Sequence, residues 1–162
     1  ALVMRDTTAG ALLVSGAVRD AVTPDHGPGG SDMAHSTGSM FDQIHRDSLS
    51  PKSVVVQLHG FNESQHPGYP DVVVSEGVPD TGIAGRAAER LRANGVNAGA
   101  YDGQHLGGLA GRNNVQGAST HAARAVFVHV ESSRAARYAP AARRALATGV
   151  ADAIRAVSER EV

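Results

Sequence analysis

The chain contains no cysteine, so it forms neither disulfides nor thiolate metal sites. Any metal ion is therefore expected to be bound through His, Asp or Glu. Tryptophan is also absent, and Phe and Tyr occur three times each. The formal net charge is −1 and no basic run alternates with aromatic residues, so we expect no nucleic-acid partner. No apolar stretch has the length of a membrane span, and we expect no membrane partner either.

A length of 162 residues fits one domain, and we take residues 1–162 as a single unit. The first residue is Ala1 instead of Met, which indicates a processed or N-terminally incomplete chain. No signal peptide is visible. The sequence therefore leaves both the compartment, secreted or cytoplasmic, and the oligomeric state undetermined.

Five short apolar runs, several of them rich in valine and bounded by Gly or Pro, predict β-strands. These runs are residues 11–15, 53–58, 71–75, 96–101 and 125–131. Continuous apolar runs of this kind are typical of strands covered on both faces, as in a largely parallel sheet.

Helical patterns alternate with these runs. Residues 36–47 carry Met40, Phe41 and Ile44 on one face. A second helix follows Thr81, a good N-cap residue, and a third begins at Pro140. The apolar stripes of these two helices are Ile83, Ala87 and Leu91, and Leu146, Val150, Ile154 and Val157. The fold class predicted is α/β, a three-layer αβα sandwich around a largely parallel, mixed sheet.

Two segments fit neither pattern. Residues 20–32 are rich in Gly, Pro and Asp, and residues 102–121 are rich in Gly, Asn and His. Long loops over an α/β sheet often carry function, although both segments could equally be plain surface loops. We expect residues 102–121 to cover the site as a mobile lid.

Two strand ends carry candidate catalytic residues. His59 follows a valine-rich strand and precedes Gly60, a placement that favours a metal ligand over a structural histidine. On the last strand, His129 and Glu131 point to the same face. A partly desolvated Glu131 is a natural general base, and the alternative is an ion pair with Arg134. We expect His59 and Glu131 to meet at one edge of the sheet.

Weaker candidates lie in the loops. Arg19 follows the first predicted strand, where its guanidinium could bind a substrate carboxylate or stabilise an oxyanion. Asp32 and His35 precede the first helix, whose free N–H groups suit an anionic substrate, although Asp32 could simply cap that helix. Asn114 and Gln116 carry amides that suit recognition of a peptide or acyl group, and such amides also make turns.

Taken in order, these segments resemble the zinc carboxypeptidase-like superfamily, which includes N-formylglutamate amidohydrolase and aspartoacylase relatives. The matching segments are Gly16-Ala17-Val18-Arg19-Asp20, Ser31-Asp32-Met33-Ala34-His35-Ser36, Val56-Gln57-Leu58-His59-Gly60, Asn114-Val115-Gln116-Gly117 and Val128-His129-Val130-Glu131-Ser132. The resemblance, which runs from about Leu12 to Arg134, implies that His59 is a zinc ligand and Glu131 the general base.

The chain departs from this family in one respect: it contains no His-x-x-Glu pair, the motif that supplies two zinc ligands. Either that segment lies upstream of Ala1, or the metal is bound differently, with His35 and His129 as candidate replacements. The resemblance implies a zinc-dependent hydrolase of an amide bond in an N-acyl amino acid or peptide-like substrate, including a cell-wall or polyglutamate polymer.

Two other readings remain open. One is a non-catalytic binding module, or an incomplete fragment, that has lost the metal site. The other is a metal-free hydrolase that uses His129 and Glu131 as an acid/base pair, although the sequence offers it no evident nucleophile.

Overall fold

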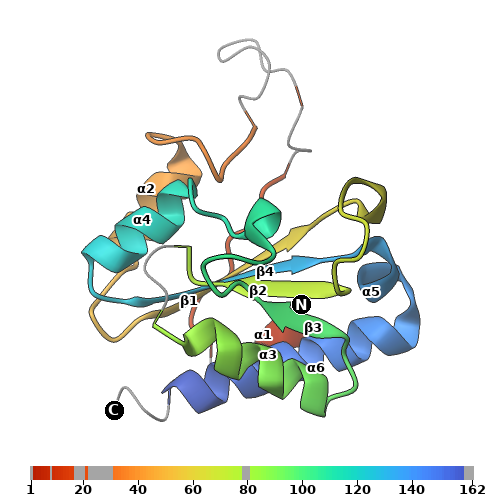
Figure 1. The fold of residues 1–162 in the computed structure, drawn as a ribbon. Coiled ribbons are helices and arrows are strands. Elements are labelled where there is room, and N and C mark those ends of the chain that lie inside the picture. Colours follow the sequence, from red (N-terminus) through yellow and green to blue (C-terminus); the bar gives the residue numbers. More distant parts are fainter. Residues whose placement is uncertain (1, 8, 17–20, 22–30, 78–80, 159–162) are drawn as a thin grey trace.

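The computed structural model describes residues 2–7, 9–16, 21, 31–77 and 81–158 (Figure 1). Within these residues the chain forms a four-stranded sheet flanked by helices. The elements are α1 (Leu2–Arg5), α2 (Met40–Asp47), β1 (Val54–Gly60), the 3-10 turn η1 (Glu63–Gln65), β2 (Val72–Ser75), α3 (Ile83–Ala93), β3 (Ala98–Ala100), the 3-10 turn η2 (Gly107–Leu109), α4 (Val115–Ala122), β4 (Val126–Ser132), α5 (Arg134–Tyr138) and α6 (Pro140–Ser158).

The strands lie in the order β1-β4-β2-β3. β1 pairs with β4 in parallel and β2 pairs with β3 in parallel, whereas β2 and β4 are antiparallel. The carboxyl ends of β1 and β4 therefore lie at one end of the sheet, where these strands terminate, and the carboxyl ends of β2 and β3 lie at the opposite end. β1 is an edge strand of this sheet.

Helices cover both faces of the sheet. α3 and α6 pack side by side on one face, and α2 and α4 lie on the other (Figure 1). The protein is thus an α/β fold with an αβα sandwich around a mostly parallel, mixed sheet, as the sequence predicts. No helix among the described residues is both long and apolar enough to cross a membrane.

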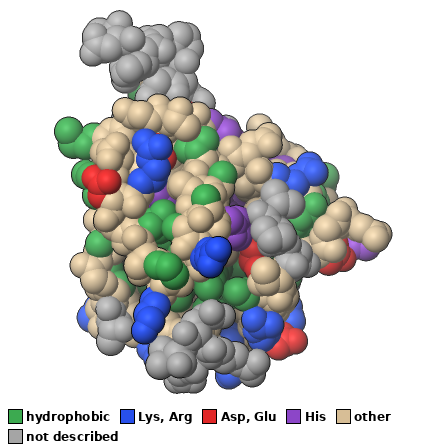
Figure 2. Space-filling view, turned by 90° about the vertical axis from the view of Figure 1, so that its left-hand side faces the viewer, with side chains coloured by type: hydrophobic (Ala, Val, Ile, Leu, Met, Phe, Trp, Pro, Cys, Tyr) green, Lys and Arg blue, Asp and Glu red, His purple; other side chains and the backbone are tan. Residues whose placement is uncertain are grey.

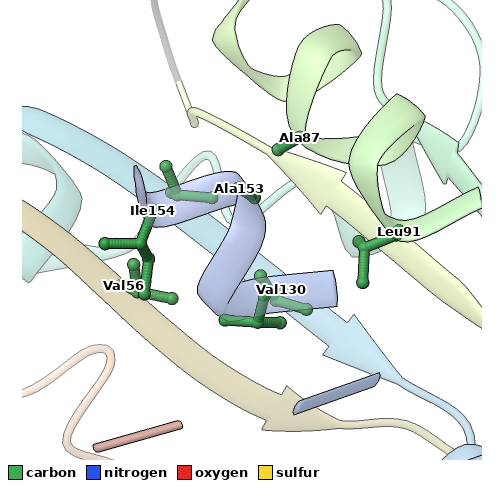
Figure 3. A pocket seen from close by; sticks show the side chains of 8 residues that line it. Val56, Ala87, Leu91, Val130, Ala153 and Ile154 are labelled. Carbon is green, nitrogen blue, oxygen red and sulfur yellow. The ribbon is translucent and has the colours of Figure 1, made fainter. Parts of the chain in front are cut away.

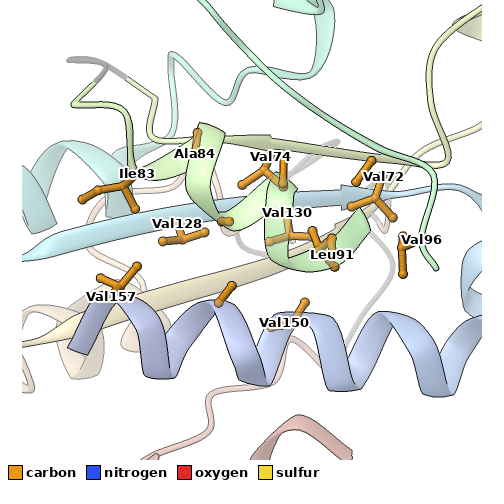
Figure 4. Packing of buried hydrophobic residues seen from close by; sticks show 14 of the residues in the cluster. Val72, Val74, Ile83, Ala84, Leu91, Val96, Val128, Val130, Val150 and Val157 are labelled. Carbon is orange, nitrogen blue, oxygen red and sulfur yellow. The ribbon is translucent and has the colours of Figure 1, made fainter. Parts of the chain in front are cut away.

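The face under α3 and α6 is a valine-rich core (Figure 4). Alternate residues of β2 and β4 point into it, among them Val72, Val74, Val128 and Val130. The stripes predicted for α3 and α6 pack against these valines. A residual cavity of about 10 Å³ lies in this layer (Figure 3); it is lined entirely by apolar side chains, namely Val56, Ala87, Leu91, Val128, Val130, Val150, Ala153 and Ile154. A space of this size holds about one water sphere and has no polar partner for it, so it is a packing gap and not a binding site.

The opposite face of the same strands carries their polar residues, together with the buried Val73 and Phe127. Gln57 and His59 on β1, His129 and Glu131 on β4, and Ser75 on β2 alternate with the core valines, and their register places them on one face. The sheet therefore separates an apolar layer from one that also holds polar groups, called the polar layer below, and the predicted site lies in this second layer.

Four predictions about local structure are wrong. Residues 11–15 form no strand: they pair with no other described segment, and Leu12 and Val14 are 56% and 73% exposed. The apolar face of α2 is turned outward, with Met40 79% exposed, whereas the polar Asp42 and His45 are buried.

The other two wrong predictions concern a cap and a loop. The N-cap of α3 is Gly82 in the left-handed conformation, and Thr81 bonds the Glu76 carboxylate instead. Residues 102–121 are not one loop, because they contain η2 and the helix α4. Asn114 caps α4 by accepting a hydrogen bond from the Gly117 amide. Residues 20–32 lie mostly outside the described residues, so that interpretation stays a prediction.

Candidate metal centre

His59 and Glu131 are direct neighbours across the parallel ladder of β1 and β4. Each is the last residue but one of its strand, and parallel pairing places the two side chains on the same polar face. The expected approach of these two residues is confirmed. It follows from the parallel pairing, which brings two carboxyl ends together at one edge.

His129 completes a group of three. One ligating atom from each of His59, His129 and Glu131 lies within 4.8 Å of the others. The Nε2 atom of His129 is 3.8 Å from Oε1 of Glu131, and the two imidazole rings have centroids 4.9 Å apart. His59 and Glu131 are partly exposed, whereas His129 is buried, so the group lies at the solvent boundary of the polar layer.

The protonation of His129 suits metal binding. Burial is the main cause, with the nearby His59 imidazole as a second one, and together they lower its pKa from 6.5 to about 3. The ring is therefore neutral at physiological pH. A neutral imidazole is the form that binds a metal ion.

The donor set fits zinc. Two imidazoles and one carboxylate, with no thiolate, are a common set for zinc sites that keep a coordination position open. Around zinc, with bonds of about 2.0–2.2 Å, ligand atoms lie roughly 3.4 Å apart. The three ligand atoms observed here lie within 4.8 Å of one another, and zinc binding would have to draw them closer together.

A short segment covers the group. A Cβ atom at Gly111 would lie 3.1 Å from three atoms of the His129 ring, so this glycine packs directly on the imidazole. The preceding residues, Leu109 and Ala110, are buried. Part of the predicted lid, residues 106–111, thus lies over the site as expected. The mobility of this segment stays a prediction.

Beside the three residues lies a buried hydrogen-bond network. Gln57, two residues before His59 on β1, accepts a hydrogen bond from the Asn114 side chain and donates one to Gln116 Oε1 at 3.3 Å. Gln116 in turn donates to Asp42 Oδ1 at 3.3 Å. Asn114 and Gln116 are 4% and 1% exposed. These contacts give both residues a structural task, and their predicted role in substrate binding stays a prediction.

The remaining predicted site residues lie apart from this group or outside the described residues. Asp32 and His35 pair with each other, Oδ2 to Nδ1 at 2.9 Å. The carbonyl of Ala34 between them accepts from the Val115 amide at 2.9 Å, which places the pair at the start of α4. Arg19 lies outside the described residues. Arg134, the alternative partner of Glu131, lies over the Tyr138 ring at 5.5 Å.

From sequence, His129 is only a candidate replacement ligand, and Ser75 is not a candidate. His129 shares its face with Glu131 by simple alternation, which was the available signal. Ser75 ends the valine run of β2, and an antiparallel partner strand places it opposite His129. No local pattern reveals that pairing.

No protein-family model, no curated protein and no solved structure matches this chain. Function is therefore inferred from the geometry of the site and from the sequence of this chain. On the face of the molecule seen in Figure 2, the Lys and Arg side chains that are described are scattered among apolar and uncharged groups and form no continuous basic patch.

Proposed function

We propose that the chain is a zinc-dependent hydrolase of an amide bond, with His59, His129 and Glu131 as its metal-binding residues. The observation that carries the proposal is the convergence of these three side chains, whose ligating atoms lie within 4.8 Å of one another. Three protein ligands leave a fourth position for water, which is the arrangement of catalytic zinc sites.

The protein residues have distinct tasks in this proposal. A bound zinc ion supplies a Lewis acid for the amide carbonyl and lowers the pKa of its water. His59 and His129 hold the ion through neutral nitrogens. Glu131 contributes one carboxylate oxygen, and we favour this role over the general base predicted from sequence because Oε1 lies 3.8 Å from the His129 Nε2. Gly111 excludes water from the buried side of the site.

The substrate class comes from the resemblance in sequence: an N-acyl amino acid or a peptide-like chain. The test is hydrolysis of N-formyl and N-acetyl amino acids by metal-free protein, with and without added zinc. The proposal expects release of the acyl group with zinc, none after chelation, and none from His59→Ala protein with zinc. Hydrolysis that survives chelation and the His59→Ala change would contradict it.

A second candidate is a zinc-binding module without catalytic activity. It is favoured by the cover on the site, because His129 is 3% exposed and Gly111 lies against its ring. His59 and Glu131 are partly exposed as residues, but His59 Nε2 and Glu131 Oε2 are themselves buried. Tight zinc binding without hydrolysis of any N-acyl or peptide substrate would select this candidate.

A further inference from the structure

Ser75 lies at the junction between the metal-binding group and its cover. Its side chain is fully buried at the end of β2, opposite His129 on β4. Its Oγ is 2.7 Å from the carbonyl oxygen of Ala110 and 3.4 Å from Nδ1 of His129. One hydroxyl thus contacts both a candidate ligand and the segment that covers it.

The hydrogen-bond chemistry of that hydroxyl fixes the state of the ring. A serine hydroxyl has one proton, and a carbonyl oxygen can only accept. The Ser75 proton is therefore donated to Ala110, and towards His129 the Ser75 oxygen acts as an acceptor. For the 3.4 Å contact to be a hydrogen bond, Nδ1 of His129 has to be the donor and therefore to carry the ring proton. The lone pair is then on Nε2, the nitrogen that lies 3.8 Å from Glu131.

The covering segment has a conformation that needs such an anchor. Leu106 and Gly111, at its two ends, have φ angles of 64° and 62°. The left-handed conformation at Leu106 is unfavourable for a residue with a side chain, because its Cβ is close to the carbonyl. Between them, Leu109 packs with Phe61 and Val73 on the polar side of the sheet. The packing of Leu109 and the hydrogen bond from Ser75 to Ala110 together hold the segment against the sheet.

We propose that Ser75 is a positioning residue that holds His129 in its Nδ1–H tautomer and ties the ring to the cover formed by residues 106–111. Ligand orientation by such a hydrogen bond typically changes metal affinity about 10- to 100-fold. The coupling is reciprocal: metal binding at His129 stabilises the closed segment, and closure of the segment strengthens metal binding.

The inference rests on the proposed function for the identity of the metal ion, but two of its readouts use the metal-free protein. The first is the tautomer of His129, read from ¹⁵N chemical shifts of labelled histidine and assigned with the His129→Gln variant. The second is hydrogen exchange at the Leu109 and Ala110 amides, which bond within the cover. The tautomer is a property of the unmodified protein, and the His129→Gln variant serves only to assign its signals.

The variants are Ser75→Ala and, as a matched control, Ser133→Ala. Ser133 is also fully buried, and it caps α5 and bonds Asp71. We expect an Nδ1–H tautomer in the unmodified protein. In Ser75→Ala we expect a mixed tautomer, about fivefold faster exchange at Leu109 and Ala110, and zinc affinity about 10- to 100-fold lower. Ser133→Ala leaves all three readouts unchanged.

An Nε2–H tautomer in the unmodified protein overturns the inference, as does a Ser75→Ala protein in which either metal-free readout is unchanged. Absence of zinc binding in every protein, together with the expected tautomer and exchange, refutes the proposed function and leaves the role of Ser75 standing. The two failures are therefore distinguishable.

Discussion

His59 on β1 and Glu131 on β4 are register partners in a parallel ladder, although 71 residues lie between them in the sequence. Their side chains share the polar face of the sheet with His129. This pairing, and not any local motif, creates the candidate metal centre.

Glu131→Gln tests how the carboxylate acts. The amide keeps the size of the side chain but is a poor zinc ligand, so we expect both zinc affinity and turnover to fall. Zinc titration and a hydrolysis assay measure the two effects separately. Zinc affinity equal to that of the unmodified protein, with turnover lost, would return Glu131 to the role of general base.

The stability of the metal-free protein should depend on pH through His129. Its pKa in the folded state is about 3, against 6.5 ordinarily, so below pH 6.5 the unfolded state binds the proton and the folded state does not. Stability therefore falls as the pH falls from about 6.5 towards 3, by up to about 1.4 kcal/mol per pH unit for this group.

Urea denaturation at about pH 7 and pH 5 measures this dependence before most carboxylates titrate. His129→Gln should give a shallower dependence. Some dependence should remain, because burial also lowers the pKa of His45. Equal slopes in the variant and the unmodified protein would contradict the neutral, buried state of His129.

Gly111→Ala should loosen the cover. The added Cβ lies 3.1 Å from the His129 ring, in a backbone conformation with φ of 62° that disfavours a side chain. Gly103→Ala is the matched control, because its φ is 93° but the space around it is open. We expect Gly111→Ala to lose about 1–3 kcal/mol more in unfolding free energy and to bind zinc more weakly. Equal losses in the two variants would show that no close packing exists at His129.

Gln116→Ala separates structure from substrate binding. The buried amide bonds Gln57 and Asp42, so its removal strands both partners and should lower stability by about 1–3 kcal/mol. Thermal unfolding measures this loss. A variant of unchanged stability that has a raised KM would instead support the substrate-binding role predicted from sequence.

The sequence is a good guide to elements whose pattern is local. The valine runs of β1, β2 and β4 and the apolar stripes of α3 and α6 are where periodicity predicts them. Residues 11–15 have the same apolar character, yet a strand needs a partner ladder and this segment has none among the described residues. Helix α4 was overlooked because its Gly, Ser and Thr residues are weak helix formers, and tertiary packing and the Asn114 cap stabilise it.

The site was only half predictable for a similar reason. Alternation places His129 and Glu131 on one face, but which strand lies next to β4, and in which register, is a tertiary property. A shift of one residue in the pairing would turn His59 to the core face. The same holds for α2. Its polar face, with Asp42 and His45, is buried against α4, whereas the apolar stripe in its sequence predicts that the opposite face is buried.

Zinc titration of the purified, metal-free protein tests the central claim most directly. His59→Ala and His129→Ala are compared with His105→Ala, which removes an exposed histidine paired with Asp102 away from the site. We predict about one zinc ion per chain in the unmodified protein and in His105→Ala, and an affinity at least about a hundredfold lower in the other two variants. No zinc binding by the unmodified protein, or equal binding in all four proteins, would contradict the account.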